Sequence, residues 1–197
     1  MFVLDRRSFM ALTGAGLGAA AVPGLAQAGI GEATVFTADA AGALVDSTVI
    51  LGEKKALLVD AQFDVANATR LADIIAATGR ELETIWITHA HPDHLLGLAV
   101  LMDRFPGAKP LTHAAIRPGM EQSAQGTLDF LTGMSPGVFA GRVVLPDAAS
   151  TDHLLLEGER IDILDPMRGD TALISALHIP VLDTLVAADF VYSDTFA

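Results

Sequence analysis

The sequence predicts a mixed α/β fold, and three features of its hydrophobic pattern lead to this prediction. A buried strand is expected at residues 82–88, which are rich in β-branched and aromatic side chains. A helix with regularly spaced apolar positions is expected directly after it, at about residues 95–105. Short strands separated by turns are expected on both sides of this unit, and the length of the chain suits one domain.

The segment before the central strand is expected to contain β structure and then a helix. After a short first strand, residues 47–51 and 56–60 are expected to form a hairpin around the polar turn at 52–55. Asp64 is a suitable N-cap for the next helix, and Gly79 is a suitable stop. Helix and strand therefore alternate up to the centre of the chain.

The second half is expected to return to strands. Residues 114–150 have little periodicity and many Gly, Pro, Ser and Thr residues. A hairpin is expected from residues 154–156 and 160–164. Two further strands are expected at residues 171–179 and 184–191.

Three imidazoles and one carboxylate are concentrated in the loop between the central strand and its helix. Side chains alternate in an extended segment, so His89 and His91 are expected to point the same way. Pro92 forces a bend, which can turn Asp93 and His94 toward a second, nearby point. Such a loop can supply ligands to two adjacent metal ions. The alternative, a purely structural cluster, fits poorly with three of six histidines lying in six residues.

This loop carries a resemblance to a known family. The segment His89-Ala90-His91-Pro92-Asp93-His94 resembles the H-x-H-x-D-H signature of the metallo-β-lactamase fold hydrolases. Gly169-Asp170-Thr171 stands where that family usually has G-H-T, and Ala188-Asp189 stands where it has G-D, nineteen residues further on. The similarity extends from about Thr34 to the end of the chain.

The resemblance implies an αββα sandwich with metal at one edge of its two sheets. It also implies a hydrolase, in which metal-bound hydroxide attacks an ester, lactone, amide or thioester bond. Asp93 would be the catalytic residue that orients the water or moves its proton. The implied ligands are His89, His91 and Asp170 for a first metal, Asp93 and His94 for a second, and Asp189 as a bridge between the two.

Two departures from the family pattern modify these expectations. Asp170 replaces the third metal-binding His, and no His follows His178, so the family's last metal-binding His is absent. The chain stops eight residues after Asp189, and the αββα sandwich is therefore expected to be truncated at its C-terminus. One or two zinc ions are expected, the second held weakly. Iron or manganese is the alternative, because Asp170 is a harder ligand than His.

The resemblance also suggests roles for residues around the metal loop. Asp60 is expected either to support the loop through hydrogen bonds or simply to end its strand. The segment around a helix near Asp129 is expected either to border the substrate pocket or to pack in the core. Its candidate lining residues are Phe130, Met134 and Phe139. The remaining histidines, which are not expected to bind metal, are His113, His153 and His178.

Composition narrows the choice of function. A net charge of −12 argues against binding to nucleic acid or to anionic membranes, so a small-molecule substrate is expected. The absence of cysteine excludes disulfides and thiolate metal sites. The resemblance makes a metal-dependent hydrolase, with zinc as the expected metal, the first hypothesis. The alternatives are a non-haem iron oxidoreductase, for which His89, His91 and Asp170 form a two-His-one-carboxylate set, and an inactive metal-binding protein or fragment.

Residues 1–28 are expected to be a signal peptide rather than part of the domain at 29–197. Arg6-Arg7 resembles a twin-arginine export signal, and the apolar run after it is too short and mild to span a membrane stably. Ala26-Gln27-Ala28 matches a small-x-small cleavage site. The prediction is a periplasmic protein that uses the twin-arginine export machinery. The alternative is an N-terminal amphipathic helix.

Overall fold

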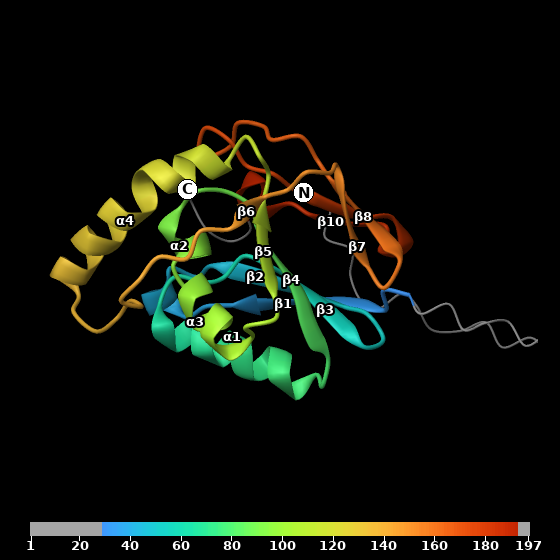
Figure 1. Ribbon diagram of the computed structural model, residues 1–197, viewed down its shortest axis with the longest axis horizontal. Helices are drawn as coiled ribbons and strands as arrows, with labels where there is room; N and C mark the ends of the chain where they lie inside the picture. Colours follow the sequence, from blue (N-terminus) through green and yellow to red (C-terminus); the bar gives the residue numbers. More distant parts are fainter. Residues whose placement is uncertain (1–28, 193–197) are drawn as a thin grey trace, which may run out of the picture.

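Two stacked β-sheets form the centre of the protein in the computed structural model, which describes residues 29–192 (Figure 1). The large sheet has the strand order β1-β2-β3-β4-β5-β6 and the small sheet the order β10-β9-β8-β7. The large sheet contains β1 (Glu32–Thr37), β2 (Asp46–Leu51), β3 (Lys55–Val59), β4 (Glu81–Ile87), β5 (Lys109–Thr112) and β6 (Asp147–Ala148). The small sheet contains β7 (His153–Leu156), β8 (Glu159–Ile163), β9 (Leu177–Ile179) and β10 (Thr184–Val186).

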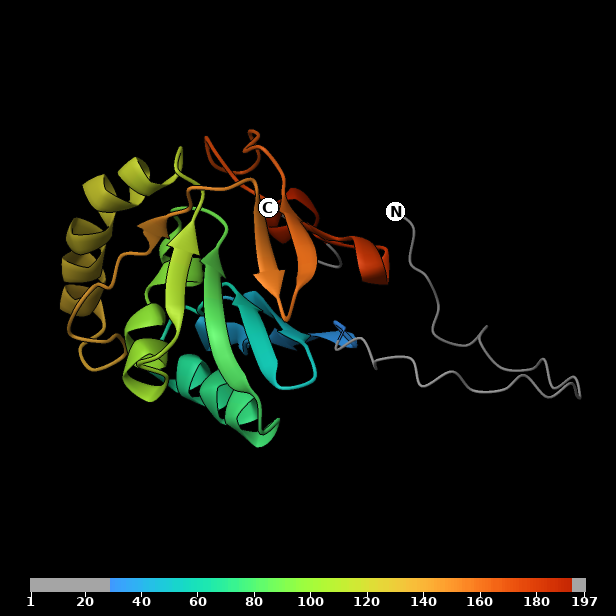
Figure 2. The same cartoon turned by 45° about the vertical axis from the view of Figure 1, so that its right-hand side comes forward.

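The helices of the described residues gather around the large sheet. Those with α-helical geometry are α1 (Val65–Ala77), α2 (Pro92–Leu95), α3 (Leu98–Arg104) and α4 (Arg117–Met134). Short 3₁₀ turns are η1 (Ala40–Gly42), η2 (Pro180–Leu182) and η3 (Ala188–Phe190). Both views place α1 and α3 on the face of the large sheet opposite the small sheet (Figures 1 and 2). The layers are therefore helix, sheet and sheet, as the α/β prediction required.

Alternation along the central strands explains why this sheet is covered on both faces. In β3, Leu58 belongs to the core shared with the helices, whereas Leu57 and Val59 belong to the core between the sheets. In β4, Ile85 faces the helices and Trp86 faces the small sheet. Side chains of successive strand residues point to opposite faces, so a continuous apolar run fits a strand buried on both sides.

Most of the elements predicted from the sequence are confirmed. The hairpin around residues 52–55 is formed by β2 and β3, and β7 and β8 form the hairpin in the second half. Asp64 is the N-cap of α1, where its side chain accepts a hydrogen bond of 2.8 Å from the backbone N–H of Asn67. Strand β4 ends at Ile87, directly before the histidine-rich loop.

Three details of the prediction were wrong. The helix expected at residues 95–105 is two helices, because α2 starts at Pro92 within the loop and breaks before α3 at Gly97. The strands expected at residues 171–179 and 184–191 shrink to β9 and β10, since a loop and η3 occupy the remainder. By contrast, the helix expected near Asp129 is confirmed as part of the long helix α4.

The outer face of the small sheet carries no α-helix within residues 29–192, where the αββα pattern would have one. Leu155 on β7 and Leu185 on β10 are 55% and 54% exposed. In the described part of the chain, no helix is long and apolar enough to cross a membrane. The signal peptide expected at residues 1–28 lies outside the described residues.

Candidate metal centre

The histidine-rich loop lies at the carboxyl end of β4, in the parallel part of the large sheet. Strand β4 pairs in parallel with β3 and β5, so loops that follow these strands meet at one edge. Open α/β sheets usually bind ligands at this edge. His89 is fully buried there, and His91 is the N-cap residue of α2, whose first turn carries Asp93 and whose last turn carries His94.

Four of the six residues predicted as metal ligands form one tight group. One ligand atom each from His89, His91, Asp170 and Asp189 lies within 4.8 Å of the others. His91 Nδ1 is 3.2 Å from an Asp170 carboxylate oxygen, and His89 Nε2 is 3.7 Å from an Asp189 carboxylate oxygen. Two histidines from one loop thus face two carboxylates that come from distant parts of the sequence.

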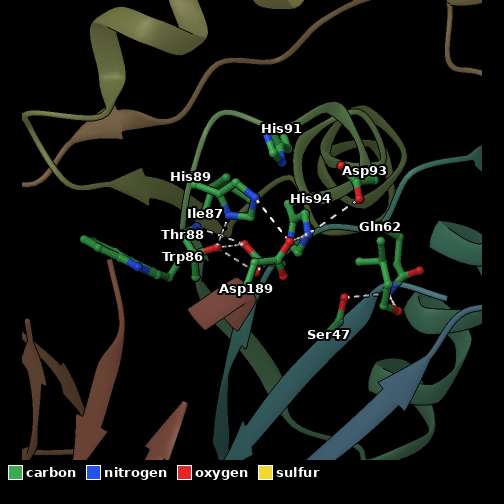
Figure 3. A network of polar contacts seen from close by, with 12 residues as sticks. Ser47, Gln62, Trp86, Ile87, Thr88, His89, His91, Asp93, His94 and Asp189 are labelled. Carbon is green, nitrogen blue, oxygen red and sulfur yellow. Dashed lines mark hydrogen bonds and ion pairs between the residues drawn. The ribbon is translucent and has the colours of Figure 1, made fainter. Parts of the chain in front are cut away.

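The other two predicted ligands, His94 and Asp93, lie next to this group, and the ring centroids of His89 and His94 are 4.2 Å apart (Figure 3). His94 Nε2 is 3.3 Å from an Asp189 oxygen and 3.7 Å from an Asp93 oxygen. The same Asp189 oxygen therefore faces both His89 and His94. This is the position that a carboxylate bridging two metal ions would need.

Asp60 is a buried anchor for the loop, in line with the supporting role considered for it. Its carboxylate accepts hydrogen bonds from the backbone N–H and the hydroxyl of Thr88, at 2.9 and 3.0 Å. It also lies 2.9 Å from His94 Nδ1, which donates to it. Because Asp60 holds the Nδ1 proton of His94, the Nε2 of that ring faces Asp93 and Asp189.

The same anchor orients His89. The Thr88 hydroxyl donates to Asp60, so its oxygen is free to accept from His89 Nδ1, which lies 2.9 Å away. This arrangement puts the proton of a neutral His89 on Nδ1 and leaves Nε2 with a free lone pair. Among the described residues His89 Nε2 has no hydrogen-bond partner, although it is buried. A buried acceptor aimed at carboxylates is satisfied by a cation, so the residues present fit a metal ion.

The segment from Asp60 to Gln62 has an unusual backbone that joins it to the loop. Asp60 and Gln62 have positive φ angles of 64° and 73°. The N–H of Ala61 donates to the carbonyl of His94, and the carbonyl of Gln62 accepts from the N–H of Gly97, both at 2.8 Å. Non-glycine residues with positive φ are uncommon and often occur at functional sites. Here they hold the C-terminal end of α2 and Gly97 against the segment that follows β3.

Burial and neighbouring charges shift the pKa values of three groups in this site. Burial lowers the pKa of His89, and the positive charge of His94 lowers it further, which keeps His89 neutral. Burial opposes protonation of His94, but the charges of Asp60 and Asp189 raise its pKa well above the usual value. Burial would raise the pKa of Asp189, but the hydrogen bond and charge of His94 outweigh it and lower that pKa to about 2.

Tyr192 is a site residue that the sequence reasoning missed. Its hydroxyl donates to Asp170 at 3.1 Å and lies 3.3 Å from Asp189, so one phenol spans both carboxylates. Burial and the charge of Asp189 raise the pKa of Tyr192 above its usual value, which keeps the hydroxyl protonated as a donor. The available signal was weak: Tyr192 is the only tyrosine of the chain and follows Asp189 by three residues.

A cavity of about 810 Å³ opens over this centre. It is bordered by β1, the turn before β2, the histidine loop and residues 184–192. Phe130, Met134 and Phe139, which were expected either to line the substrate pocket or to pack in the core, do not border this cavity. Phe130 and Met134 project from α4 and are each 67% exposed. Phe139 packs edge-on against Phe63 with ring centroids 4.9 Å apart.

The three histidines outside the loop stay away from the centre. His178 on β9 lies 3.4 Å from Asp162 on β8, and His153 pairs with its neighbour Asp152 at 2.7 Å. His113 Nδ1 accepts a hydrogen bond of 3.1 Å from the backbone N–H of Ala115. Each ring thus has a partner of its own elsewhere in the fold.

The two-sheet α/β fold, with histidines and carboxylates at one sheet edge, places this protein in the class of candidate metalloproteins. Comparison of the sequence with family models identifies the family. The model of the metallo-β-lactamase superfamily matches residues 41–196. The chain therefore belongs to the metallo-β-lactamase superfamily. No curated protein matches the sequence at a significant level.

Solved structures of similar fold include several metallo-β-lactamases. BLEG-1, a B3 metallo-β-lactamase, has a TM-score of 0.60 at 16% identity, over 78% of this chain and 70% of that one. DIM-1 has a TM-score of 0.55 at 17% identity, over 77% and 61%. The enzyme from Pontibacter korlensis has a TM-score of 0.51 at 19% identity, over 78% and 63%. These likenesses support the fold, and the chain spans roughly two thirds of the length of these structures.

Proposed function

We propose that this protein is a metal-dependent hydrolase that cleaves an ester, lactone, amide or thioester bond. The observation that carries the proposal is the buried, unpartnered Nε2 atom of His89, which faces Asp189 within the group of two histidines and two aspartates. Membership of the metallo-β-lactamase superfamily supports it. Zinc is the proposed ion, since imidazole and carboxylate are both zinc ligands.

The proposed roles follow the geometry of the site. His89, His91, Asp170 and Asp189 would hold the first ion, and His94 with Asp93 and Asp189 would form a weaker second position. A bound divalent ion would lower the pKa of water from about 15.7 to about 7 and polarise a carbonyl. Asp93 is partly exposed at the cavity, where its carboxylate can accept a proton from water and pass it to the leaving group.

The test compares three forms of the protein against a panel of chromogenic esters, lactones, thioesters and amides. The zinc-loaded chain should hydrolyse at least one class, and removal of the metal by a chelator should abolish the activity until zinc is restored. The Asp93→Asn variant should lose about 10²-fold or more in kcat while keeping the first ion. Hydrolysis that persists unchanged after the metal is removed would rule out the proposed mechanism.

A second candidate, a non-haem iron oxidoreductase, is favoured by one observation. Asp170 stands beside His91 at 3.2 Å, so His89, His91 and Asp170 form two histidines and one carboxylate of the kind that binds Fe(II). Metal competition separates the candidates. Stronger retention of iron than of zinc, together with substrate-dependent oxygen consumption, would favour the oxidoreductase over the hydrolase.

We also propose that the protein is exported to the periplasm by the twin-arginine route. The proposal rests on Arg6-Arg7, the apolar run that follows and the small-x-small site at residues 26–28. Cell fractionation of the Arg6→Lys, Arg7→Lys double variant should show the protein retained in the cytoplasm. Equal periplasmic amounts of the variant and the parent protein would disprove this route.

A further inference from the structure

The lining of the cavity over the candidate metal centre includes exposed apolar side chains. Four of them are Val35 on β1, Leu44 before β2, Leu185 on β10, and Val191. All four side chains are more than half exposed to solvent. Apolar side chains gathered at the mouth of a pocket usually contact an apolar part of a ligand. At about 810 Å³, the cavity is large enough for a small organic molecule.

The charged groups of the cavity are all acidic, apart from its histidines. Among the described residues that line it, five are aspartates and none is lysine or arginine. Those aspartates are Asp46, Asp60, Asp93, Asp170 and Asp189. Even two divalent ions would bring four positive charges against these five carboxylates. An anionic ligand would therefore meet a net negative field and would find no basic side chain to pair with.

Arg168 is a basic residue two positions before Asp170. It borders a separate cavity formed by residues 168–172, which shares Asp170 with the larger cavity. Arg168 is exposed and does not line the large cavity. Its side chain is therefore the one to remove when testing whether a basic group assists the binding of anions.

We propose that the substrate of this site is an uncharged carbonyl compound with an apolar chain, and that carboxylate-bearing substrates are rejected. The inference rests on the proposed hydrolase function and adds the chemical class of the substrate. Penicillin- and cephalosporin-type β-lactams carry a carboxylate next to the lactam ring, so they belong to the rejected class. The site would discriminate against a carboxylate-bearing substrate because the aspartates repel it and no basic side chain pairs with it. A neutral substrate would gain free energy when its apolar chain leaves water and contacts the apolar side chains of the cavity.

The hydrolysis test uses two esters that differ only at the end of the acyl chain. p-Nitrophenyl pentanoate ends in a methyl group, and mono-p-nitrophenyl glutarate ends in a carboxylate. The zinc-loaded chain should have a kcat/KM about 10-fold or more higher for the neutral ester after correction for spontaneous hydrolysis. Equal rates, or a preference for the glutarate, would overturn the proposed class while leaving the hydrolase function intact.

A binding test separates this inference from the proposed function. Pentanoic anilide and its carboxylate-terminated counterpart, glutaric acid monoanilide, are titrated into the zinc-loaded protein by calorimetry. The neutral anilide should bind at least about 10-fold more tightly. If neither ester is hydrolysed and this order of binding holds, the hydrolase function fails and the ligand class stands. Absence of binding by the neutral anilide would overturn the ligand class.

Two variants with matched exposure check that the cavity causes the preference. Leu185→Lys places a cation at the cavity wall, whereas Leu155→Lys places one on the same sheet outside the cavity, at a residue of nearly equal exposure. Leu185→Lys should reduce the preference for the neutral ester several-fold, and Leu155→Lys should leave it unchanged. Arg168→Ala should also leave it unchanged. If both lysine variants shift the preference equally, or if Arg168→Ala abolishes binding of an anionic ligand, the inference is wrong.

Discussion

Asp60 anchors the histidine-rich loop through hydrogen bonds to Thr88 and His94. We expect Asp60→Asn to weaken metal binding about 10- to 100-fold, because the amide cannot accept from both donors with a full negative charge. Asparagine tolerates the positive φ of this position better than most residues, so backbone strain is a minor contribution. Chelator competition measures the metal affinity.

The control for Asp60→Asn is the same substitution at a carboxylate that lies away from the site. Asp73 is exposed on α1, and Asp73→Asn removes the same charge from the protein without altering the loop. Its metal affinity should match that of the parent protein. Equal affinities for both variants and the parent protein would show that the hydrogen bonds of Asp60 do not tune the loop.

Tyr192 holds Asp170 and Asp189 together through one hydroxyl. Tyr192→Phe keeps the ring and removes the hydroxyl, and we expect metal affinity to fall about 3- to 10-fold. The effect is modest because Tyr192 is partly exposed and water can replace the lost donor. The measurement is a zinc titration of both proteins, with circular dichroism to confirm the fold. An unchanged affinity would mean that the two carboxylates hold their positions without the phenol.

The sequence was informative about the site where the residues are close along the chain. The alternation of side chains alone predicts that His89 and His91 point the same way. Asp170 and Asp189 were named as site residues from the family resemblance, and the structure groups them with the two histidines. Their role as ligands stays a prediction. Tyr192 could not be found in this way, because its contact depends on how the turn η3 directs the chain after Asp189.

At the scale of elements, the junction between α2 and α3 fixes the metal loop against the end of β3. A Cβ atom on Gly97 would lie 2.1 Å from the carbonyl oxygen of Ala61, and backbone atoms cannot move aside easily. Gly97→Ala should lower the free energy of unfolding by about 1–3 kcal/mol and weaken metal binding, since α2 carries His94. Urea denaturation and zinc titration measure the two effects.

Gly126 provides the matched control for this change. It lies in α4, where a Cβ would meet nothing within 4 Å. Gly126→Ala should stabilise the protein by about 0.5–1 kcal/mol, because alanine favours the helix. If Gly97→Ala were as stable as the parent protein and bound zinc equally well, the close contact at this junction would not matter for the site.

Helix α4, which was expected only near Asp129, shows why the full extent of some elements was not predictable. Its buried residues Met120, Ala124 and Leu128 form a narrow stripe at intervals of four, and glycines at positions 119, 126 and 133 interrupt the pattern. A segment with low helix propensity and a narrow apolar face is difficult to distinguish from a loop when the sequence is considered alone. The hairpins were predictable, because strong apolar alternation and a polar turn favour the same structure.

At the scale of the whole molecule, a chain of hydrogen bonds joins β4 of the large sheet to the segment that leads into β9 of the small sheet. Trp86 Nε1 on β4 donates to Ser175 Oγ at 3.1 Å, and Ser175 Oγ donates to the carbonyl of Thr88 at 3.1 Å. Ser175→Ala leaves the buried indole N–H without a partner and should cost about 1–3 kcal/mol of stability. Urea denaturation measures the loss.

The control for Ser175 is a serine whose hydroxyl is exposed. Ser123 on α4 donates to the carbonyl of Gly119 at 2.9 Å in solvent. Ser123→Ala should change the stability by less than about 0.5 kcal/mol. A similar small effect at Ser175 would mean that the contact between Trp86 and Ser175 does not help to hold the sheets together.

The central claim is that histidines from one loop and aspartates from two distant segments form one metal centre. The most direct test is the metal content of the purified protein, measured by inductively coupled plasma mass spectrometry after zinc loading and removal of free metal. We predict about one or two zinc ions per chain, loss of the first ion in His91→Ala, and no loss in His178→Ala, whose ring lies beside Asp162. Absence of bound metal, or full retention in His91→Ala, would contradict the account.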